Sequence, residues 1–379
     1  MTTQQAEDRP LLGIRIVDFT TFMAGPYCTR YLADMGAEVI KVEASGGDFI
    51  RTQKPMRDGA STYFGHLNAG KKSVVLDLKN PQDVDAVRRL IATADVVVEN
   101  FRPGVMKRMG LDHQTLRRDQ PALIYCSISG FGQQGEGAER PAFAQIIQAT
   151  SGYDLANLSY QVGRDIDRPI NPLFFFADVL SAVYGLGAIA SALYQRTRTG
   201  EGQHIDLSLM ECMMNMMPYE VQEAQFPTGA MRPIYRPLRT SDGFVILVPN
   251  TQRNFENLCA SIGRPDLAND PDFATPQARG SHLDRLFDEV EKWTAERTSK
   301  ACEEKLVAAS VPCARYRTVS EAMQDPQLAL RQAFQKVVDK GGAFLVPNLP
   351  FRMTGSSVTV RPHVPELGEC DIEDLIAGS

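Results

Sequence analysis

The sequence lacks the cysteine and histidine patterns that build disulfide frameworks or metal sites. Its seven cysteines are scattered along 379 residues, and no two of them form a Cys-x-x-Cys pair. Its five histidines include neither a His-Glu-x-x-His motif nor a pair four residues apart. Dispersed cysteines in odd number argue against a set of disulfides, and the spacing matches no zinc motif. We therefore expect no bound metal.

An excess of basic residues is also missing. The chain has 40 Lys and Arg against 46 Asp and Glu, which gives a formal net charge of -6. Nucleic acids and anionic membranes are bound through positively charged surfaces, so neither is an expected partner. The first ten residues are polar and lack the apolar stretch of a signal peptide. These absences predict a cytoplasmic protein.

Only residues 174–194, FFFADVLSAVYGLGAIASALY, form an apolar run long enough to span a bilayer. Asp178 lies within this run, and a carboxylate is costly in lipid. A helix that is apolar on all sides is also typical of the centre of a large soluble domain. We expect a buried helix here and no membrane span.

The chain does contain a regular alternation of strand and helix patterns. Hydrophobic residues make up 43% and charged residues 23%, as in a globular protein of about two or three domains. Over the first 130 residues the alternation predicts an α/β fold with a Rossmann-like parallel sheet. The predicted strands are 13–19, 39–42, 73–78, 95–98 and 122–128, and the predicted helices are 25–36, 81–94 and 103–109. A ligand site is expected beyond the carboxyl ends of the strands, at the loops 20–25, 43–48, 99–104 and 129–137.

The composition changes near residue 220. Residues 220–240 are rich in proline and arginine and are predicted to be a linker between a large domain, 1–219, and a smaller α+β domain, 241–325. The small domain is predicted to contain a strand at 244–248 and helices at 254–262, 282–296 and 300–308. Residues 326–340 are a predicted return linker. Strand-like pieces follow at 344–346 and 357–361, and the chain ends in a polar tail.

One motif imitates a dinucleotide fingerprint. Gly130-Phe-Gly132-Gln-Gln-Gly135 follows a predicted strand, but it continues into Glu-Gly137-Ala-Glu-Arg-Pro141 instead of opening a helix. A true fingerprint places the amino end of a helix against the pyrophosphate. We interpret the stretch as a glycine-rich loop whose backbone amides either approach a ligand or simply turn. The sequence contains no Walker A motif and no Gly-x-Ser-x-Gly motif.

Asp178 is the acidic residue with the most apolar surroundings. A carboxylate there costs free energy unless it is paired or hydrogen-bonded. It is either an ordinary N-cap of the apolar helix or a desolvated nucleophile held ionised by helix-end amides. Basic residues near the ligand edge either are solvated or neutralise phosphates of a ligand; they are Lys71, Lys72, Lys79, Arg102, Lys107 and Arg108.

Several stretches, taken in order, resemble the class III coenzyme A transferases, the CaiB/BaiF family. The likeness covers nearly the whole chain, and the ordered set is specific although no single motif is. The matching stretches are Val17-Asp-Phe-Thr with Ala24-Gly-Pro26, Gly36-Ala-Glu-Val-Ile-Lys-Val-Glu43, Leu76-Asp-Leu-Lys79, Ala94-Asp-Val-Val-Val-Glu-Asn-Phe-Arg-Pro-Gly104, Arg108-Met-Gly110, Ser129-Gly-Phe-Gly132, the Asp178 helix, Thr199-Gly-Glu-Gly-Gln203 and Tyr235-Arg-Pro-Leu-Arg-Thr-Ser-Asp-Gly243.

This resemblance implies a reaction and a set of site residues. Asp178 takes the position of the family's catalytic aspartate, which attacks an acyl-CoA thioester and is converted through an anhydride into an aspartyl-CoA thioester. Coenzyme A is then a substrate, passed from an acyl-CoA to a carboxylic acid, and no prosthetic group is implied. The coenzyme A contacts fall on Phe22, Met23, Leu76, Lys79, Asn100, Phe101 and Arg108.

The departures from the family pattern bear on the substrate. Formyl-CoA transferase has a glutamine in place of Met23 and an arginine in place of Ala44, and it has a lysine and a glutamate near Arg140–Ala144, which argues against formate or oxalate here. Phe174–Phe176 is a candidate apolar wall for the acyl group. Candidate partners for a second carboxylate are Arg232, Arg236 and Arg239, for which the alternative is a solvated linker.

The resemblance also implies an assembly and leaves one alternative activity. The family forms an interlocked homodimer, in which the large domain is completed by the C-terminal segment, here 330–379. The same fold resembles α-methylacyl-CoA racemases, which move a proton instead of coenzyme A. Racemases carry Gly-His-Asp where this chain has Pro-Ala-Phe at 141–143, so the base histidine is missing.

Overall fold

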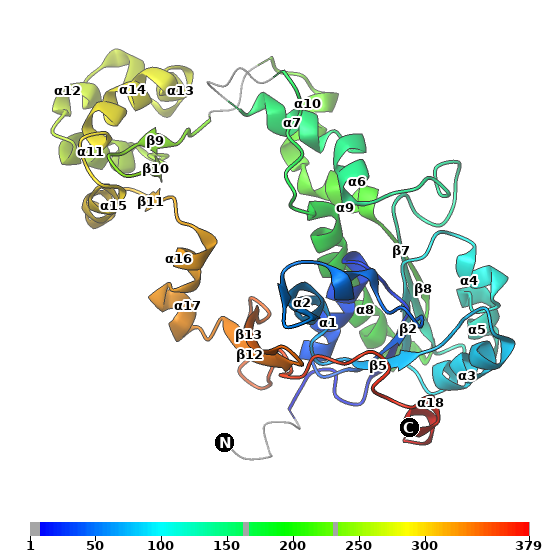
Figure 1. The fold of residues 1–379 in the computed structure, drawn as a ribbon. Coiled ribbons are helices and arrows are strands. Elements are labelled where there is room, and N and C mark those ends of the chain that lie inside the picture. Colours follow the sequence, from blue (N-terminus) through cyan, green and yellow to red (C-terminus); the bar gives the residue numbers. More distant parts are fainter. Residues whose placement is uncertain (1–7, 162–166, 230–233, 379) are drawn as a thin grey trace. The chain divides into compact units, whose positions relative to one another are not determined.

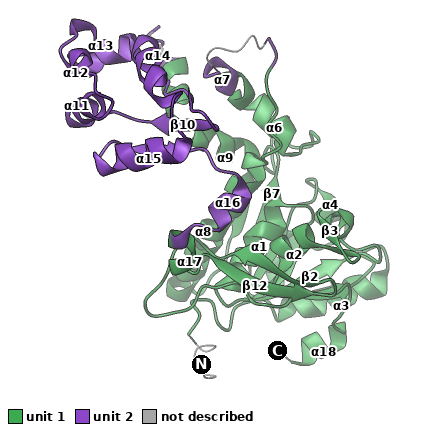
Figure 2. Ribbon diagram, turned by 60° about the vertical axis from the view of Figure 1, so that its left-hand side comes forward, with its two compact units in different colours: residues 1–156, 169–224, 327–379 green, residues 157–168, 225–326 purple. Residues whose placement is uncertain are grey.

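The computed structural model describes residues 8–161, 167–229 and 234–378. The chain divides into two compact units (Figure 2). Unit 1 takes in the described parts of 1–156, 169–224 and 327–379, and unit 2 those of 157–168 and 225–326. Unit 1 contains all of the large sheet, Asp178 and the seven predicted coenzyme A contacts.

A six-stranded parallel sheet forms the centre of unit 1 (Figure 1). Its order is β5-β2-β1-β6-β7-β8, and each neighbouring pair is parallel. The strands are β1 (Arg15–Asp18), β2 (Glu38–Glu43), β5 (Lys72–Val75), β6 (Val96–Glu99), β7 (Ile124–Ser129) and β8 (His204–Ser208). The α/β class with a Rossmann-like parallel sheet is thereby confirmed.

Helices cover both faces of this sheet, and the strand residues alternate between two cores. Ile16 and Val39 belong to the core under α1 and α8, whereas Val17 and Ile40 belong to the core under α3 and α18. Burial of both faces explains why consecutive apolar residues occur within a strand, such as Val96 to Val98 in β6. The covering helices are α1 (Ala24–Asp34), α3 (Pro81–Ala92), α8 (Phe176–Thr199), α9 (Leu209–Met216) and α18 (Ile372–Ala377).

The apolar run at 174–194 forms most of α8. Among the described residues it is the one helix long and apolar enough to cross a membrane, and 39% of its most apolar window is buried in the structure. Gly185 brings α8 close to α1, since an added Cβ there would lie 2.8 Å from the Cys28 sulfur. Ala182 and Ile189 on the same face are fully buried.

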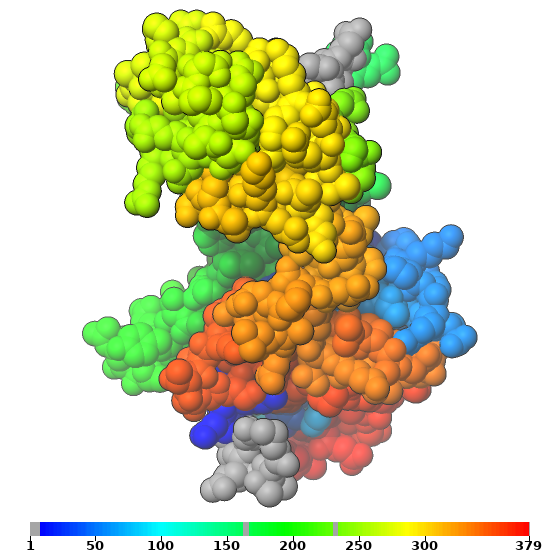
Figure 3. All heavy atoms as spheres, turned by 90° about the vertical axis from the view of Figure 1, so that its left-hand side faces the viewer, coloured from blue at the N-terminus to red at the C-terminus, as the bar shows by residue number. Residues whose placement is uncertain are grey.

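The C-terminal segment packs on unit 1 in ways that the sequence did not indicate. The hairpin of β12 (Phe334–Asp339) and β13 (Gly342–Pro347) begins inside the predicted return linker and shares a core with α2 (Thr62–Asn68). The predicted strand at 357–361 is wrong, because these residues form no strand. The predicted polar tail contains α18. In Figure 3 the orange and red atoms of this segment lie beside the blue N-terminal atoms, where Arg9 donates to the Thr359 carbonyl at 2.8 Å.

Unit 2 is a small α+β body with its own core. An antiparallel sheet of β9 (Leu238–Arg239), β10 (Phe244–Leu247) and β11 (Cys313–Arg315) packs under helices, and Phe255, Phe273 and Phe287 are fully buried. The principal helices are α11 (Gln252–Ser261), α13 (Pro276–Ser281), α14 (Leu283–Thr294) and α15 (Ser299–Ala308). The predicted linker 220–240 is partly regular, since it holds much of α10 (Pro218–Gln225) and all of β9.

Gly202 provides a test of the packing of the sheet edge. A Cβ at this position would lie 2.2 Å from the Leu123 carbonyl oxygen, so the backbone between α8 and β8 must move. We expect Gly202→Ala to lower the free energy of unfolding by about 2 kcal/mol or more in urea titrations. The control is Gly46→Ala, because an added Cβ there meets open space. Equal stability of the two variants would contradict this account.

Candidate active site

Loops at the carboxyl ends of the strands surround a cavity of about 340 Å³ in unit 1. The β1–α1 loop contributes Thr21 and Phe22, and the loop after β6 contributes Asn100 to Pro103. Asp178 enters the same cavity from the start of α8. The ligand edge predicted from the strand order therefore holds the acidic residue singled out in the sequence. The other lining residues are Ala24, Ile128, Ser129, Gly130, Ala138, Arg140, Pro141, Ala142, Phe143 and Leu209.

Asp178 is not the N-cap of α8. The helix begins at Phe176, its N-cap is Phe175, and Asp178 lies in the first turn. Gln148 takes part of the capping role, because its Oε1 accepts a hydrogen bond from the Phe176 N–H at 3.0 Å. The carboxylate therefore does not cap the helix. The partial positive charge at the start of the helix still favours its ionised form.

The Asp178 carboxylate has an apolar setting and no cation beside it. Burial raises its pKa to about 7. No described residue forms an ion pair with it, although it retains some exposure toward the cavity. An ionised carboxylate that is poorly solvated and unpaired is more reactive than one in water.

A second cavity of about 290 Å³ adjoins the first. Thr21 and Phe101 line both cavities, so the two cavities share a wall at the sheet edge. Leu76 and Lys79, which follow β5, line the second cavity. Its walls are mostly apolar and include Phe19, Val42, Leu78, Val105 and Met109. Lys79 at the second cavity is exposed.

The structure gathers most of the predicted site residues but not all of them. Phe22, Asn100 and Phe101 lie in the first cavity, and Leu76, Lys79 and Phe101 in the second. Met23 lines neither, and its sulfur accepts a hydrogen bond from the Tyr63 hydroxyl at 3.3 Å. Arg108 ends α4 (Val105–Arg108), is exposed and also lines neither. The contacts predicted for these two residues stay predictions.

Aromatic side chains line the first cavity, but they are not those expected. Phe22 and Phe143 lie edge to face with ring centroids 5.5 Å apart. Phe174 is 72% exposed, and none of Phe174–Phe176 lines the cavity. Phe143 went unnoticed in the sequence, because it lies in an irregular loop with no periodic pattern. The glycine-rich loop gives Gly130 to the cavity and opens no helix, which agrees with its interpretation as a loop.

The basic residues separate into neutralised and unneutralised groups. Lys71 is buried against Asp18, and Lys72 pairs with Glu38. Within the described chain, no carboxylate pairs with Arg102 or Arg140, which line the first cavity. The Arg140 guanidinium lies 4.6 Å from the centre of the Phe131 ring.

Two of the three arginines proposed for a second carboxylate belong to unit 2. Arg236 is already paired with Asp288 and Glu291 inside unit 2. Arg239 lies over the Phe244 ring, also inside unit 2. Arg232 lies outside the described residues. The unpaired cations at the Asp178 cavity, Arg102 and Arg140, therefore fit an anionic ligand better.

Known proteins are similar to this chain over nearly its whole length. The model of CoA-transferase family III matches residues 11–370. The succinate–glutarate CoA-transferase of Agrobacterium fabrum is 34% identical over 97% of this chain and 96% of its own. The acetyl-CoA:oxalate CoA-transferase of Acetobacter aceti is 34% identical over 97% and 95%. A crystal structure of a CaiB/BaiF family protein from Brucella suis has a TM-score of 0.83 at 32% identity, covering 96% of this chain and 97% of that one.

The raised pKa of Asp178 predicts a pH-dependent cost to stability. An aspartate in the unfolded chain has a pKa of about 3.9. Between that pH and about 7 the folded chain binds one more proton than the unfolded chain, so the free energy of unfolding falls as pH rises. We expect Asp178→Asn to remove this loss and to exceed the wild type by on the order of 1 kcal/mol above pH 7 in urea titrations.

The matched control for this titration is Asp112→Asn. Although burial raises the pKa of Asp112, hydrogen bonds from Thr115 and Gln114 lower it overall, so its removal has the opposite sign. A difference between wild type and Asp178→Asn that stays constant from about pH 4 to about pH 8 would contradict the placement of the carboxylate.

Proposed function

This chain belongs to CoA-transferase family III, and we propose that it passes coenzyme A from an acyl-CoA to a carboxylic acid with Asp178 as the nucleophile. The observation that carries the proposal is the Asp178 carboxylate, which has no ion-pair partner among the described residues and lines a cavity next to a second, mostly apolar one. A pantetheine arm lying in the second cavity would bring its thioester past Thr21 and Phe101 to Asp178. Lys79, which lines the second cavity, supplies a positive charge for the phosphates of coenzyme A.

The proposed reaction needs no proton to be gained or lost overall. The Asp178 carboxylate attacks the thioester carbonyl, the carbon–sulfur bond breaks, and coenzyme A leaves as a thiolate. The thiolate then attacks the aspartyl carbonyl of the anhydride, which releases the donor acid and leaves an aspartyl-CoA thioester. The acceptor carboxylate attacks this thioester and displaces the thiolate, which then attacks the acceptor acyl carbon and regenerates Asp178.

Each attack creates a tetrahedral oxyanion that backbone amides can stabilise. Helix α1 begins at Ala24 with no side chain capping its first turn, and Ala24 lines the Asp178 cavity. Gly130 lies across the same cavity. We assign the oxyanion donors to these two backbone segments, since one such donor is typically worth about 10²–10³ in rate.

The cavity also favours acids with a second carboxylate. Arg102 and Arg140 line it without a carboxylate partner among the described residues. The Agrobacterium relative is named for succinate and glutarate. Because the changes at Met23 and Ala44 argue against oxalate, we propose a longer dicarboxylate as the acid, with its far end on Arg140.

Covalent capture on Asp178 tests the nucleophile. After incubation with an acyl-CoA and quenching, we expect the Asp178 peptide to carry a mass adduct, and Asp178→Asn to lose at least about 10³-fold in turnover. The control is Asp154→Asn, a buried first-turn aspartate of α7 (Tyr153–Ser159) outside the cavity, which should stay within about twofold.

Two outcomes would overturn the transferase proposal. One is the absence of both an adduct and exchange with any acid. The other is deuterium uptake at the acyl α-carbon in heavy water without CoA transfer, which is the result that a racemase would give. The missing histidine at 141–143 makes us expect no deuterium uptake.

Arg140→Gln tests the dicarboxylate. We expect the KM for succinate to rise about tenfold, because a charge-assisted contact to its far carboxylate is lost. The KM for butyrate, which has the same chain length and no second carboxylate, should change less than about twofold. Equal rises for both acids, or a rise in the KM for acyl-CoA alone, would place Arg140 on coenzyme A instead.

A further inference from the structure

The loop that joins β1 to α1 supplies an aromatic wall of the Asp178 cavity. Phe22 lines the cavity and packs against Phe143. Its backbone has a φ of 65°, in the left-handed region that disfavours a residue with a side chain. Such a conformation persists only where the surroundings impose it. The contacts that impose it therefore shape the cavity.

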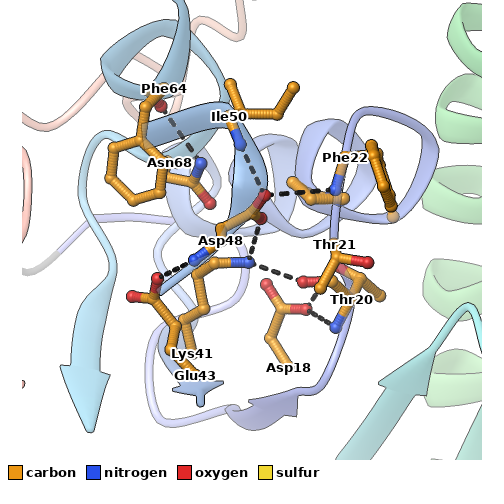
Figure 4. Close-up of polar contacts among 12 residues, drawn as sticks. Asp18, Thr20, Thr21, Phe22, Lys41, Glu43, Asp48, Ile50, Phe64 and Asn68 are labelled. Atoms are coloured by element: carbon orange, nitrogen blue, oxygen red, sulfur yellow. Dashed lines mark hydrogen bonds and ion pairs between the residues drawn. The ribbon is translucent and has the colours of Figure 1, made fainter. Parts of the chain in front are cut away.

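Buried ionic side chains hold the two ends of this loop (Figure 4). The Thr20 N–H donates to Asp18 Oδ1 at 2.8 Å, and the Thr20 carbonyl accepts from Lys41 Nζ at 2.6 Å. The Phe22 N–H donates to Asp48 Oδ1 at 3.4 Å, and Lys41 Nζ lies 3.0 Å from Asp48 Oδ2. The Lys41 ammonium group thus contacts both Thr20, at the start of the loop, and Asp48, which accepts the hydrogen bond from Phe22.

The residue between them is held from another strand end. The Thr21 N–H donates to Asn100 Oδ1 at 2.9 Å, and Asn100 Nδ2 donates to the Thr21 carbonyl at 2.8 Å. Asn100 follows β6 and itself lines the cavity. The loop therefore has side-chain partners for its backbone where a regular element would have backbone partners.

Lys41 belongs to a buried cluster whose charges balance. Asp18 and Lys41 have no exposed surface, and Lys71 and Asp48 are at most 2% exposed. Although burial by itself raises the pKa of Asp18, Lys71 and Lys41 hold it at about 2. Because desolvation offsets the attraction, a buried ion pair adds little net stability compared with apolar residues. The cluster is better explained by the geometry that it fixes.

The location of the pair supports this explanation. Strands β1 and β2 carry opposed charged residues at both ends, Arg15 across from Glu38 and Asp18 across from Lys41. The first pair is partly exposed and lies at the amino ends, away from the ligand edge. The second lies under the 20–22 loop. The Arg15–Glu38 pair lies on the same two strands but away from the loop, so substitutions there are a control for substitutions at Lys41.

We propose that Lys41 is a positioning residue for the transfer of coenzyme A, holding Phe22 beside the Asp178 carboxylate through Thr20 and Asp48. The inference rests on the proposed function, because it concerns the approach of the thioester to Asp178. Lys41 lines neither cavity, whereas Asp48 lines the second, so Lys41 acts through the loop and through Asp48. A displaced wall misaligns the reacting carbonyl, which lowers kcat more than it raises KM.

A charge-neutral double variant tests the proposal. Lys41→Met with Asp48→Asn removes one charge of each sign, so no buried charge is left uncompensated. We expect kcat to fall about tenfold or more while the KM for acyl-CoA changes less than about threefold. The control, Arg15→Met with Glu38→Gln, should keep kcat within about twofold. An unchanged kcat in the first variant, or equal losses in both, would overturn the proposal.

The Phe22→Ala variant tests whether Lys41 acts through Phe22. In the Phe22→Ala enzyme, the Lys41→Met and Asp48→Asn changes should lower kcat by less than about twofold further, because the side chain that they position is already gone. Losses that multiply would show that Lys41 acts by another route and would contradict the proposal.

A comparison at Phe22 covers the case in which the double variant does not fold. Phe22 is 39% exposed, so the core is left intact by substitutions there. Phe22→Leu keeps an apolar side chain at this position and Phe22→Gly removes it, so leucine should retain several-fold more kcat if a held side chain aligns the thioester. The reverse order would overturn the inference. A wild-type enzyme that neither labels Asp178 nor exchanges CoA would instead overturn the proposed function itself.

Discussion

The arrangement depends on the carboxylate of Asp178, which is partly buried and has no counterion among the described residues. Asp178 gains this position because α8 starts at the carboxyl edge of a parallel sheet, where α1 also starts. Burial raises its pKa to about 7, so the folded chain loses stability when Asp178 ionises, which does not happen for an ordinary surface aspartate. A carboxylate that lowers folding stability and yet lines a mostly apolar cavity is suited to forming a bond to a ligand.

Two kinds of polar chemistry lie on either side of the same loop. Toward the cavity, Asp178, Arg102 and Arg140 have no ion-pair partner among the residues that the structure describes. Beneath the loop, Lys41 and its neighbours are fully paired and almost fully buried. The outer groups are available for chemistry because the inner ones satisfy the backbone that carries Phe22. This division lets a short irregular loop serve as a fixed wall.

Local patterns in the sequence predicted the parts of the fold that depend on local physics. The strands around Val17, Ile40 and Val97 are apolar on both faces, and the alternation with helices was enough to give the parallel sheet and its ligand edge. The glycine-rich loop was separated from a dinucleotide motif because no helix pattern followed it.

Features that depend on long-range packing were not predictable. The hairpin β12–β13 and helix α18 owe their structure to contacts with distant parts of unit 1, and Phe143 gains meaning only when the 130–143 loop folds beside Phe22. The most direct test of the central claim uses an acceptor acid whose carboxylate carries a heavy oxygen isotope. The proposed anhydride leaves one acceptor oxygen on the enzyme at each turnover, so the Asp178 peptide should become heavier by that isotope. Transfer of CoA with no label in Asp178 would contradict the account.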